Sequence, residues 1–184
     1  MLRTLRQIGR IGIITEAAPA VDDSLRATEA LQSNILDVLG RALCIRAVDA
    51  GSCNGCELEI HALNNPLYNI EGLGIRFVAS PRHADLLLVT GPVAKNMEMA
   101  LRLTFEATPD PKLVVAVGDC GCTGGIFGEI YACCGRGSNV IPVDVAVPGC
   151  PPSPRRILSG ILTAITKDRP QATHRAAASR VSDA

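Results

Sequence analysis

Four cysteines stand in glycine- or proline-rich turns, and each turn follows an apolar run that reads as a β-strand. They are Cys53, Cys56, Cys120 and Cys150. The carboxyl ends of parallel strands gather at one edge of an α/β sheet, where cofactors bind in the loops. Four thiolates at that edge form a site for a soft metal, and a [4Fe-4S] cluster is the leading candidate. Such a site would make the chain an electron carrier.

The segments that carry these cysteines are Cys53-Asn54-Gly55-Cys56-Glu57, the glycine-rich run 118–125 and the proline-flanked run 148–152. A helix is predicted to begin near Gly55. Its free N–H groups and positive dipole end would stabilise a cluster that four thiolates make anionic. The spacing of Asn54 and Glu57 is typical of a capping pair at the start of that helix.

Eight cysteines in 184 residues have three interpretations. A disulfide framework is typical of small, secreted, loop-rich domains, and we expect this chain to have neither property. Structural zinc usually takes two close cysteine pairs, whereas here one close pair joins two widely separated single cysteines. Iron–sulfur ligation therefore fits best, with zinc and disulfides left as alternatives.

The remaining cysteines are Cys44, Cys122, Cys133 and Cys134. Cys44 lies in an apolar strand and reads as a small buried hydrophobic residue. Cys122 is predicted to pack beside the cluster. A second cluster built from these four is disfavoured, because a strand cysteine and two adjacent loop cysteines fit no usual ligand spacing.

Two acidic residues follow the first cysteine pair and have different expected roles. Glu57 is expected to cap the helix or to be solvated. Glu59 is a candidate proton-coupling acid, because an acid near a buried redox centre can accept a proton when the cluster is reduced. The three histidines have no companions in the sequence and are predicted surface residues, namely His61, His83 and His174.

Apolar runs and helical patterns alternate along residues 41–166. This alternation predicts an α/β fold of flavodoxin-like type, a doubly wound parallel sheet with helices on both faces. The predicted strands are 42–48, 75–79, 85–90, 113–117 and 140–147. The predicted helices are 55–64, 93–106 and 154–166, and residues 121–137 are expected to be irregular. The run at 85–90 is almost entirely apolar, so this strand is expected to be buried on both faces.

The whole chain is predicted to have three parts. Residues 1–40 form an N-terminal extension with one helix, from about Asp23 or Ser24 as its cap to Leu39. Residues 41–166 form the iron–sulfur domain of flavodoxin-like type. Residues 167–184 are rich in Ala, Ser and Arg and are predicted to be a disordered, flexible tail.

The composition excludes several classes of function. The formal net charge is zero, so no global field would attract nucleic acid. Aromatic residues make up 3% and Trp is absent, which leaves few rings for stacking on bases. No run approaches the ~18 apolar residues of a membrane-spanning helix, and no export signal is evident. We therefore expect a cytoplasmic protein that reaches a membrane only through partner subunits, with no nucleic-acid partner.

The three motifs together resemble those of the small subunits of membrane-bound, energy-converting [NiFe] hydrogenases, most closely the formate-hydrogenlyase type. The resemblance covers roughly residues 41–166, and its motifs are 49–59, 118–125 and 148–152. The same superfamily contains the cluster-bearing 20 kDa subunit of NADH:quinone oxidoreductase, complex I. That branch has two adjacent cysteines where this chain has Gly55 and Cys56. Here Gly55 replaces one of the two adjacent cysteines, and Cys53 supplies that ligand instead. This spacing is the one found in the hydrogenases.

The resemblance implies that Cys53, Cys56, Cys120 and Cys150 hold a single [4Fe-4S] cluster. This would be the cluster proximal to the active site of a [NiFe] hydrogenase large subunit, itself similar to the 49 kDa subunit of complex I. One cluster is expected because the chain ends about one helix after Cys150. Glu59 matches an acid shared across the superfamily. The chain would be a subunit of an oxidoreductase with no catalytic centre of its own.

The resemblance also implies further partners and a location. Electrons would arrive through a ferredoxin-like subunit, and membrane-embedded subunits would translocate ions. The complex would then hold this chain peripherally on the cytoplasmic side of the inner membrane.

Two other functions stay open. In one, the large partner lacks nickel, and the chain is the equivalent cluster subunit of a complex-I-like oxidoreductase. That complex would transfer electrons from NAD(P)H or ferredoxin to a quinone or another acceptor. In the other, the cysteines hold structural zinc in an interaction module. The nickel, iron and zinc contents of the purified assembly distinguish these functions.

Overall fold

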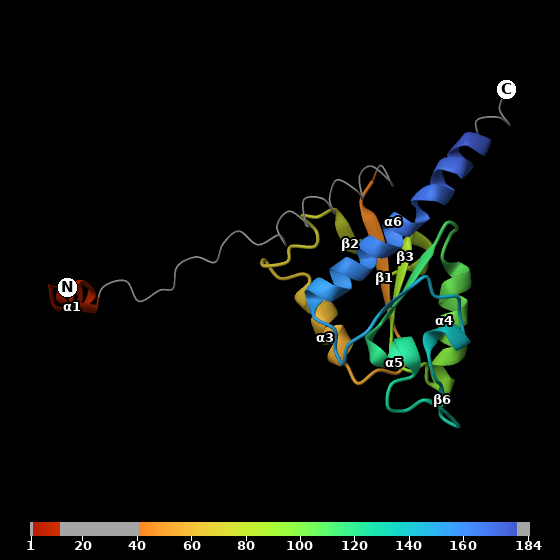
Figure 1. The fold of residues 1–184 in the computed structure, drawn as a ribbon, viewed down its shortest axis with the longest axis horizontal. Helices are drawn as coiled ribbons and strands as arrows, with labels where there is room; N and C mark the ends of the chain where they lie inside the picture. Colours follow the sequence, from red (N-terminus) through yellow and green to blue (C-terminus); the bar gives the residue numbers. More distant parts are fainter. Residues whose placement is uncertain (1, 12–40, 180–184) are drawn as a thin grey trace.

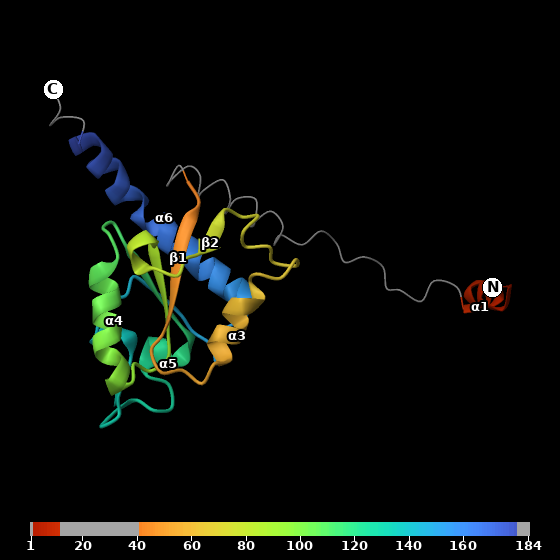
Figure 2. The same ribbon diagram turned by 180° about the vertical axis from the view of Figure 1, so that it is seen from behind.

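The computed structural model of the protein describes residues 2–11 and 41–179. Helix α1 spans Leu2–Ile11. The helix predicted at residues 23–39 lies outside the described residues. The main body is a parallel sheet with helices packed on both of its faces, as the two opposite views in Figures 1 and 2 show.

Five strands form this sheet. They are β1 (Leu43–Asp49), β2 (Ile75–Phe77), β3 (Leu86–Thr90), β4 (Leu113–Val117) and β7 (Val145–Val147). Their order is β2-β1-β3-β4-β7, and every neighbouring pair is parallel. This is the strand order of flavodoxin-like folds, with a switch point between β1 and β3. The predicted fold class is therefore confirmed.

Strand β3 shows why the sheet needs helices on both sides. All five of its residues are buried. Leu86 and Leu88 belong to one apolar cluster, whereas Leu87 and Val89 belong to the other. Successive side chains of a strand point to opposite faces, so a strand that is apolar throughout must be covered twice.

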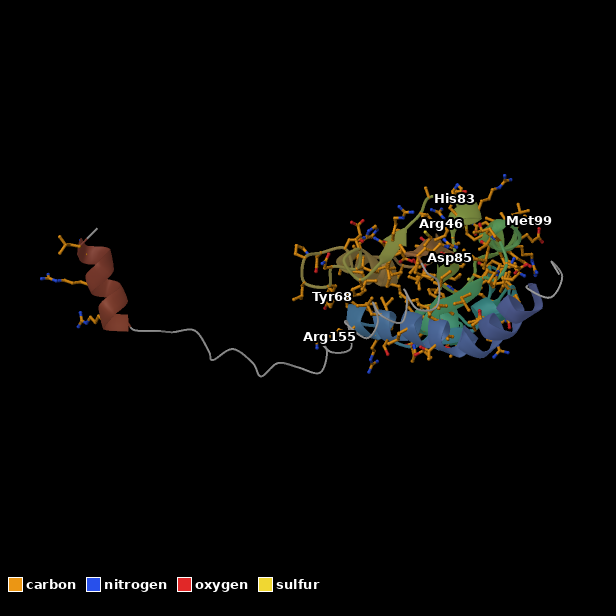
Figure 3. All side chains as sticks on the ribbon, turned by 90° about the horizontal axis from the view of Figure 1, so that it is seen from above. Arg46, Tyr68, His83, Asp85, Met99 and Arg155 are labelled. Carbon is orange, nitrogen blue, oxygen red and sulfur yellow. The ribbon has the colours of Figure 1, made fainter. Side chains whose placement is uncertain are left out.

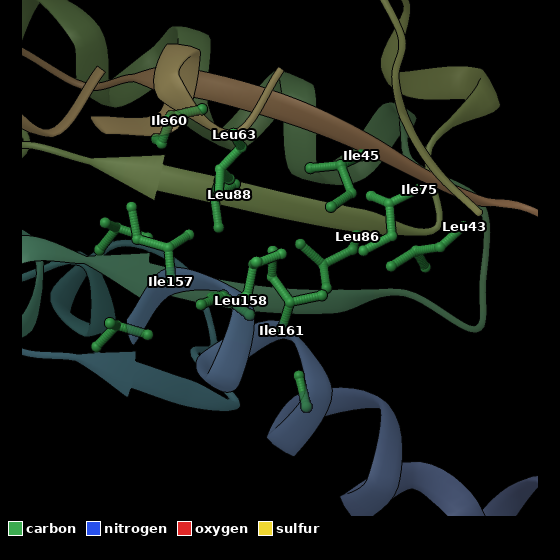
Figure 4. Packing of buried hydrophobic residues seen from close by; sticks show 14 of the residues in the cluster. Leu43, Ile45, Ile60, Leu63, Ile75, Leu86, Leu88, Ile157, Leu158 and Ile161 are labelled. Carbon is green, nitrogen blue, oxygen red and sulfur yellow. The ribbon is translucent and has the colours of Figure 1, made fainter. Parts of the chain in front are cut away.

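Helices α3 (Gly55–Ala62) and α6 (Pro154–Ser179) cover one face. Figure 4 shows Ile60, Ile157 and Ile161 from these helices packed against Ile45 and Leu88 of the strands. Ile157 and Ile161 are fully buried and stand four residues apart, which places them on one side of α6. This spacing fixes α6 along the sheet and positions the loop that precedes it.

Helix α4 (Lys95–Ala107) covers the other face. Its fully buried Leu101 shares a cluster with Val89 and Val114. Arg102 Nη1 donates a hydrogen bond of 2.9 Å to the carbonyl of Val140, which ties the helix to the segment before β7. The helices thus cover the two faces of the sheet, and the cysteine loops lie at the edge where the strands end.

Several boundaries differ from the predictions. The segment expected to be irregular contains helix α5 (Gly118–Thr123) and a small antiparallel pair, β5 (Glu129–Ile130) with β6 (Cys133–Cys134). The last strand is shorter than residues 140–147, because the 3₁₀ turn η2 (Gly137–Asn139) and a loop precede it. A second 3₁₀ turn, η1 (Pro81–His83), comes before β3.

Helix α6 is longer than predicted, since it continues past residue 166 to Ser179. The division of the chain into an extension, a domain and a flexible tail stays a prediction. Among the described residues, none of the helices combines the length and the apolar character needed to cross a bilayer.

Candidate metal centre

All four candidate ligands lie at the carboxyl edge of the sheet. Cys53 is in the loop between β1 and α3, and Cys56 is in the first turn of α3. Cys120 is in α5, which begins directly after β4, and Cys150 follows β7. Figure 1 shows the beginnings of α3 and α5 at the same end of the sheet. Cys53 and Cys150 are exposed and the other two are half-buried, so the site opens to the surface.

The thiols are close enough that the ionisation of Cys56 and Cys120 responds to the other ligand cysteines. Burial raises the pKa of Cys56 from 9.0 to about 12, together with the negative charges of Glu57, Cys120, Cys53 and Cys150. The pKa of Cys120 is also raised, by burial first and then by Cys150 and Cys53. Four thiolates in this place repel one another, so a positive core is needed to hold them ionised together.

Glycine backbone atoms lie close to the sulfur atoms of three of the candidate ligands. A Cβ atom added to Gly118 would lie 2.5 Å from Cys56 Sγ, and one added to Gly125 would lie 2.8 Å from Cys120 Sγ. A Cβ atom at Gly55 would meet Cys53 Sγ at 3.5 Å. The sulfurs thus rest against bare backbone. Four soft donors in a glycine-lined cradle fit an iron–sulfur group.

The arrangement must also be compared with that of a single metal ion. No group of three His, Cys, Asp or Glu residues suited to one ion occurs in the part of the chain that the structure describes. The predicted occupant has a different requirement, because each thiolate of a [4Fe-4S] cluster binds its own iron. All eight cysteines are free thiols, so the disulfide alternative is wrong.

Asp119 ties the third ligand loop to the fourth. Its backbone N–H donates to the carbonyl of Gly149 at 2.9 Å, and its carboxylate Oδ1 accepts from the N–H of Gly149 at 2.8 Å. The two bonds run in opposite directions between neighbours of Cys120 and Cys150. The two bonds therefore fix the separation of these two ligand loops.

Asp49 and Ser52 organise the first ligand loop. Asp49 Oδ1 accepts from the N–H groups of Gly51 and Ser52, both at 2.8 Å. Ser52 Oγ in turn accepts from the N–H of Asn54 at 3.1 Å. These three short-range hydrogen bonds hold the loop around Cys53 in place without a regular element.

The predicted capping pair is wrong. Asn54 has φ 70° and makes no side-chain hydrogen bond at the start of α3. The Glu57 carboxylate instead accepts from Ser52 Oγ at 2.6 Å and from Thr90 Oγ1 at the end of β3. Left-handed backbone at Asn54 turns its side chain away from the helix, and the sequence pattern carries no sign of this.

Glu57 and Thr90 also line a cavity of about 320 Å³ between α3 and the ends of β1 and β2. Arg46 and His61 line the same cavity. Sequence reasoning missed this group, because Glu57 and Thr90 are 33 residues apart and only the parallel pairing of β1 with β3 brings them together. Glu59 is half-buried on the same helix, and its proton-coupling role stays a prediction.

The other four cysteines have separate partners. Cys44 Sγ lies 3.9 Å from Arg76 Nη2 near the amino end of β1, and Cys122 Sγ lies 3.6 Å from the carbonyl of Ala116. Cys134 Sγ lies 3.2 Å from Glu98 Oε2 of α4. Cys133 is its neighbour in β6. Different partners at different places mean that these thiols do not form a second set of ligands.

Comparison with protein families gives a match over residues 53–164, more than half of the chain, to the family described as NADH ubiquinone oxidoreductase, 20 Kd subunit. The matched segment begins at Cys53 and includes Cys56, Cys120 and Cys150.

Two relatives are, by name, subunits of a formate hydrogenlyase and of a membrane-bound hydrogenase. Formate hydrogenlyase subunit 7 of Escherichia coli is 42% identical over 145 residues, which cover 79% of this chain and 56% of that protein. The probable membrane-bound hydrogenase subunit mbhJ of Pyrococcus furiosus is 47% identical over 129 residues, which cover 70% of this chain and 77% of that protein.

A solved structure has the same fold. It is that of a membrane-bound sulfane sulfur reductase, an archaeal respiratory membrane complex. One of its chains superposes with a TM-score of 0.61 and 34% identity, and the match covers 74% of both chains.

Proposed function

We propose a function for this chain from the premise that it belongs to the family of the NADH ubiquinone oxidoreductase 20 kDa subunit. It is an electron-transfer subunit that carries one [4Fe-4S] cluster on Cys53, Cys56, Cys120 and Cys150. The cluster is proximal to the active site of a [NiFe] hydrogenase large subunit in a membrane-bound complex. The observation that carries the proposal is the placement of the four cysteines at one edge of the sheet, in the segments that follow β1, β4 and β7.

When bound, the cluster supplies a one-electron redox centre. The chain's own residues do the rest. The glycines behind the sulfurs let the backbone approach them, and the start of α3 presents free N–H groups beside Cys56. The Asp119–Gly149 bonds hold two ligand loops at a fixed separation.

An exposed apolar surface beside the ligands supports a large partner subunit. Ile126 is 94% exposed and Tyr131 is 95% exposed, and both lie in the segment between α5 and β6. Phe127 and Ile130 of the same segment are also exposed, as is Leu58 of α3. This segment reaches the site at Gly125, where an added Cβ atom would lie 2.8 Å from Cys120 Sγ, so its apolar side chains fit a partner that covers the site and excludes water.

The relatives support the rest of the assembly. Their names describe formate hydrogenlyase and a membrane-bound hydrogenase. The further partners are a ferredoxin-like subunit that delivers electrons and membrane-embedded, ion-translocating subunits. The chain lies peripherally on the cytoplasmic side of the membrane. Glu59 takes up a proton when the neighbouring redox centre is reduced.

The sulfane sulfur reductase similarity favours a second candidate function. In it, the chain is the equivalent cluster subunit of a complex-I-like oxidoreductase whose large partner lacks nickel. Nickel and iron analysis of the intact complex separates the two. About one nickel per large subunit supports the hydrogenase, whereas iron without nickel supports the alternative. Zinc without iron contradicts both.

Replacement of one ligand tests the site. Cys120→Ala should abolish the paramagnetic signal of this one cluster in the reduced complex, because three thiolates cannot complete the ligand set. Cys122→Ala is the matched control, since its sulfur contacts the carbonyl of Ala116 instead. Electron paramagnetic resonance and iron content are measured on both variants. An unchanged signal in Cys120→Ala removes that residue from the site.

A further inference from the structure

A second cavity lies at the amino edge of the sheet, opposite the cysteine loops. Its volume is about 530 Å³, within the roughly 300–1,000 Å³ typical of small-molecule sites. The starts of β1, β3 and β4 line it, together with β2, η1 and α6. The apolar part of the cavity wall is formed by Leu43, Leu113 and Ile165. Figure 3 views the molecule from above and labels His83 and Asp85 of this cavity near one another.

Basic side chains from three different segments meet at this cavity. Arg41 precedes β1, Arg76 comes from β2, and Arg82 and His83 come from η1. Arg41 is far in sequence from the other three residues, and the pairing of β1 with β2 and β3 brings it to the same cavity. Because the cysteine site is at the other edge, the redox function does not explain this cluster.

The acidic residues of the cavity already form ion pairs with basic side chains. Asp85 Oδ1 pairs with Arg41, and its Oδ2 accepts from the N–H of Cys44 at 3.0 Å. Asp110 Oδ1 pairs with Lys112 Nζ at 3.7 Å. Among the side chains that the structure describes, none with a carboxylate pairs with Arg76 or Arg82.

Arg76 and Arg82 therefore carry positive charge that the cavity does not neutralise. Among the described side chains, the polar partner of Arg76 is a sulfur, Cys44 Sγ at 3.9 Å. An exposed arginine is commonly just hydrated, but two uncompensated guanidiniums on one concave, partly apolar wall provide a binding site for an anion. The planar fork of a guanidinium matches phosphate oxygens two at a time, which a lysine cannot do.

We propose that this cavity binds a phosphate-bearing ligand. The phosphate lies between Arg76 and Arg82, with His83 beside it, and the apolar part of the ligand packs on Leu43 and Ile165. The same chemistry belongs to a soluble phosphorylated metabolite and to the headgroup of an anionic phospholipid, and the test separates these two sources.

The test uses the purified full-length chain and two probes. Glycerol 3-phosphate is titrated by calorimetry, and co-sedimentation is measured with vesicles of phosphatidylcholine containing one quarter phosphatidylglycerol. The variant is Arg76→Gln with Arg82→Gln. Its matched control, Arg136→Gln with Arg156→Gln, removes the same charge from exposed arginines outside the cavity.

The cavity variant should weaken binding about tenfold or more, and the control should change it less than about twofold. Binding of glycerol 3-phosphate identifies a soluble ligand, whereas binding of vesicles alone identifies a lipid headgroup. Equal losses in the two variants would show attraction by bulk charge, and absence of binding to both probes would also overturn the proposal.

Two further variants test whether the double variant loses binding because it misfolds. Arg82→Gln alone changes only an exposed side chain of η1 and should cause part of the loss. Arg76→Lys keeps the charge but loses the fork, so it should bind more weakly than the native chain. Iron content should be unchanged in every variant, which keeps the result independent of the proposed redox function.

Discussion

Gly118 is the residue at which the backbone and a ligand sulfur compete for space. Its φ is +85°, and a Cβ atom there would lie 2.5 Å from Cys56 Sγ. Gly118→Ala should therefore displace the sulfur and reduce iron content to below half of the native value. Gly128→Ala is the matched control, because Gly128 also has a positive φ (+59°) but an added Cβ atom would meet nothing within 4 Å. Equal iron loss in both variants would mean that backbone strain, not sulfur displacement, is responsible.

The raised pKa of Cys56 has a consequence for the metal-free chain. The folded state holds the Cys56 proton up to about pH 12, whereas an ordinary thiol loses it near 9.0. The folded state binds this proton more tightly than the unfolded state does, so the stabilisation is complete below about pH 9. It should be lost as the pH rises from about 9 to about 12.

Denaturant unfolding of the metal-free chain across this range measures the effect. The free energy of unfolding should fall with pH in the native sequence and fall less steeply in Cys56→Ser, which has no thiol to titrate. Parallel slopes in the two chains would show that Cys56 does not contribute.

Single residues differ in how far the sequence predicts them. The spacing of Cys53 and Cys56 in a glycine-containing turn predicts metal ligands from the sequence alone. The partners of Glu57 could not be predicted in the same way, because Thr90 is 33 residues away and becomes a neighbour only through strand pairing. Local patterns therefore favoured a helix cap that the left-handed Asn54 does not form.

Helix α6 holds the fourth ligand loop against the sheet. Ile161 is fully buried, and the helix passes so close to β7 that a Cβ atom on Gly160 would clash with Val147 Cγ2. Ile161→Ala should lower the free energy of unfolding by about 2–5 kcal/mol, because it leaves a cavity in the core. Ser159→Ala, at an exposed position of the same helix, should change it by less than about 0.5 kcal/mol. Denaturant titration measures both, and similar losses would contradict this role of α6.

Strands and helices could be predicted from the sequence where the run of apolar residues is long. The almost unbroken apolar run of β3 predicts burial on both faces, and the structure confirms it. Strands β5 and β6 have two residues each, which is too short for a period of two to be recognised. Only tertiary contacts hold them, such as the bond from the Cys134 N–H to the carbonyl of Val93 at 2.8 Å.

The molecule as a whole presents different chemistry at its two edges. Exposed apolar side chains lie in α3 and in the segment after α5, the elements that carry Cys56 and Cys120, and uncompensated guanidiniums line a cavity at the other edge. Ile126→Ser with Tyr131→Ser should therefore reduce co-purification of the large subunit about tenfold while leaving the iron of the isolated chain unchanged. Leu67→Ser, which changes an 80% exposed leucine in the loop after α3, is the control. Normal recovery of the large subunit with the double variant would place its contact elsewhere.

The three ligand loops follow β1, β4 and β7, which are far apart along the chain. A ribosome therefore releases the first thiol pair long before the last one, and no short emerging segment contains the full set. For the cluster of the proposed function, insertion of iron and sulfide would have to wait until the sheet has closed around β7. Any maturation factor that delivers the inorganic core would thus recognise a finished surface instead of a nascent peptide.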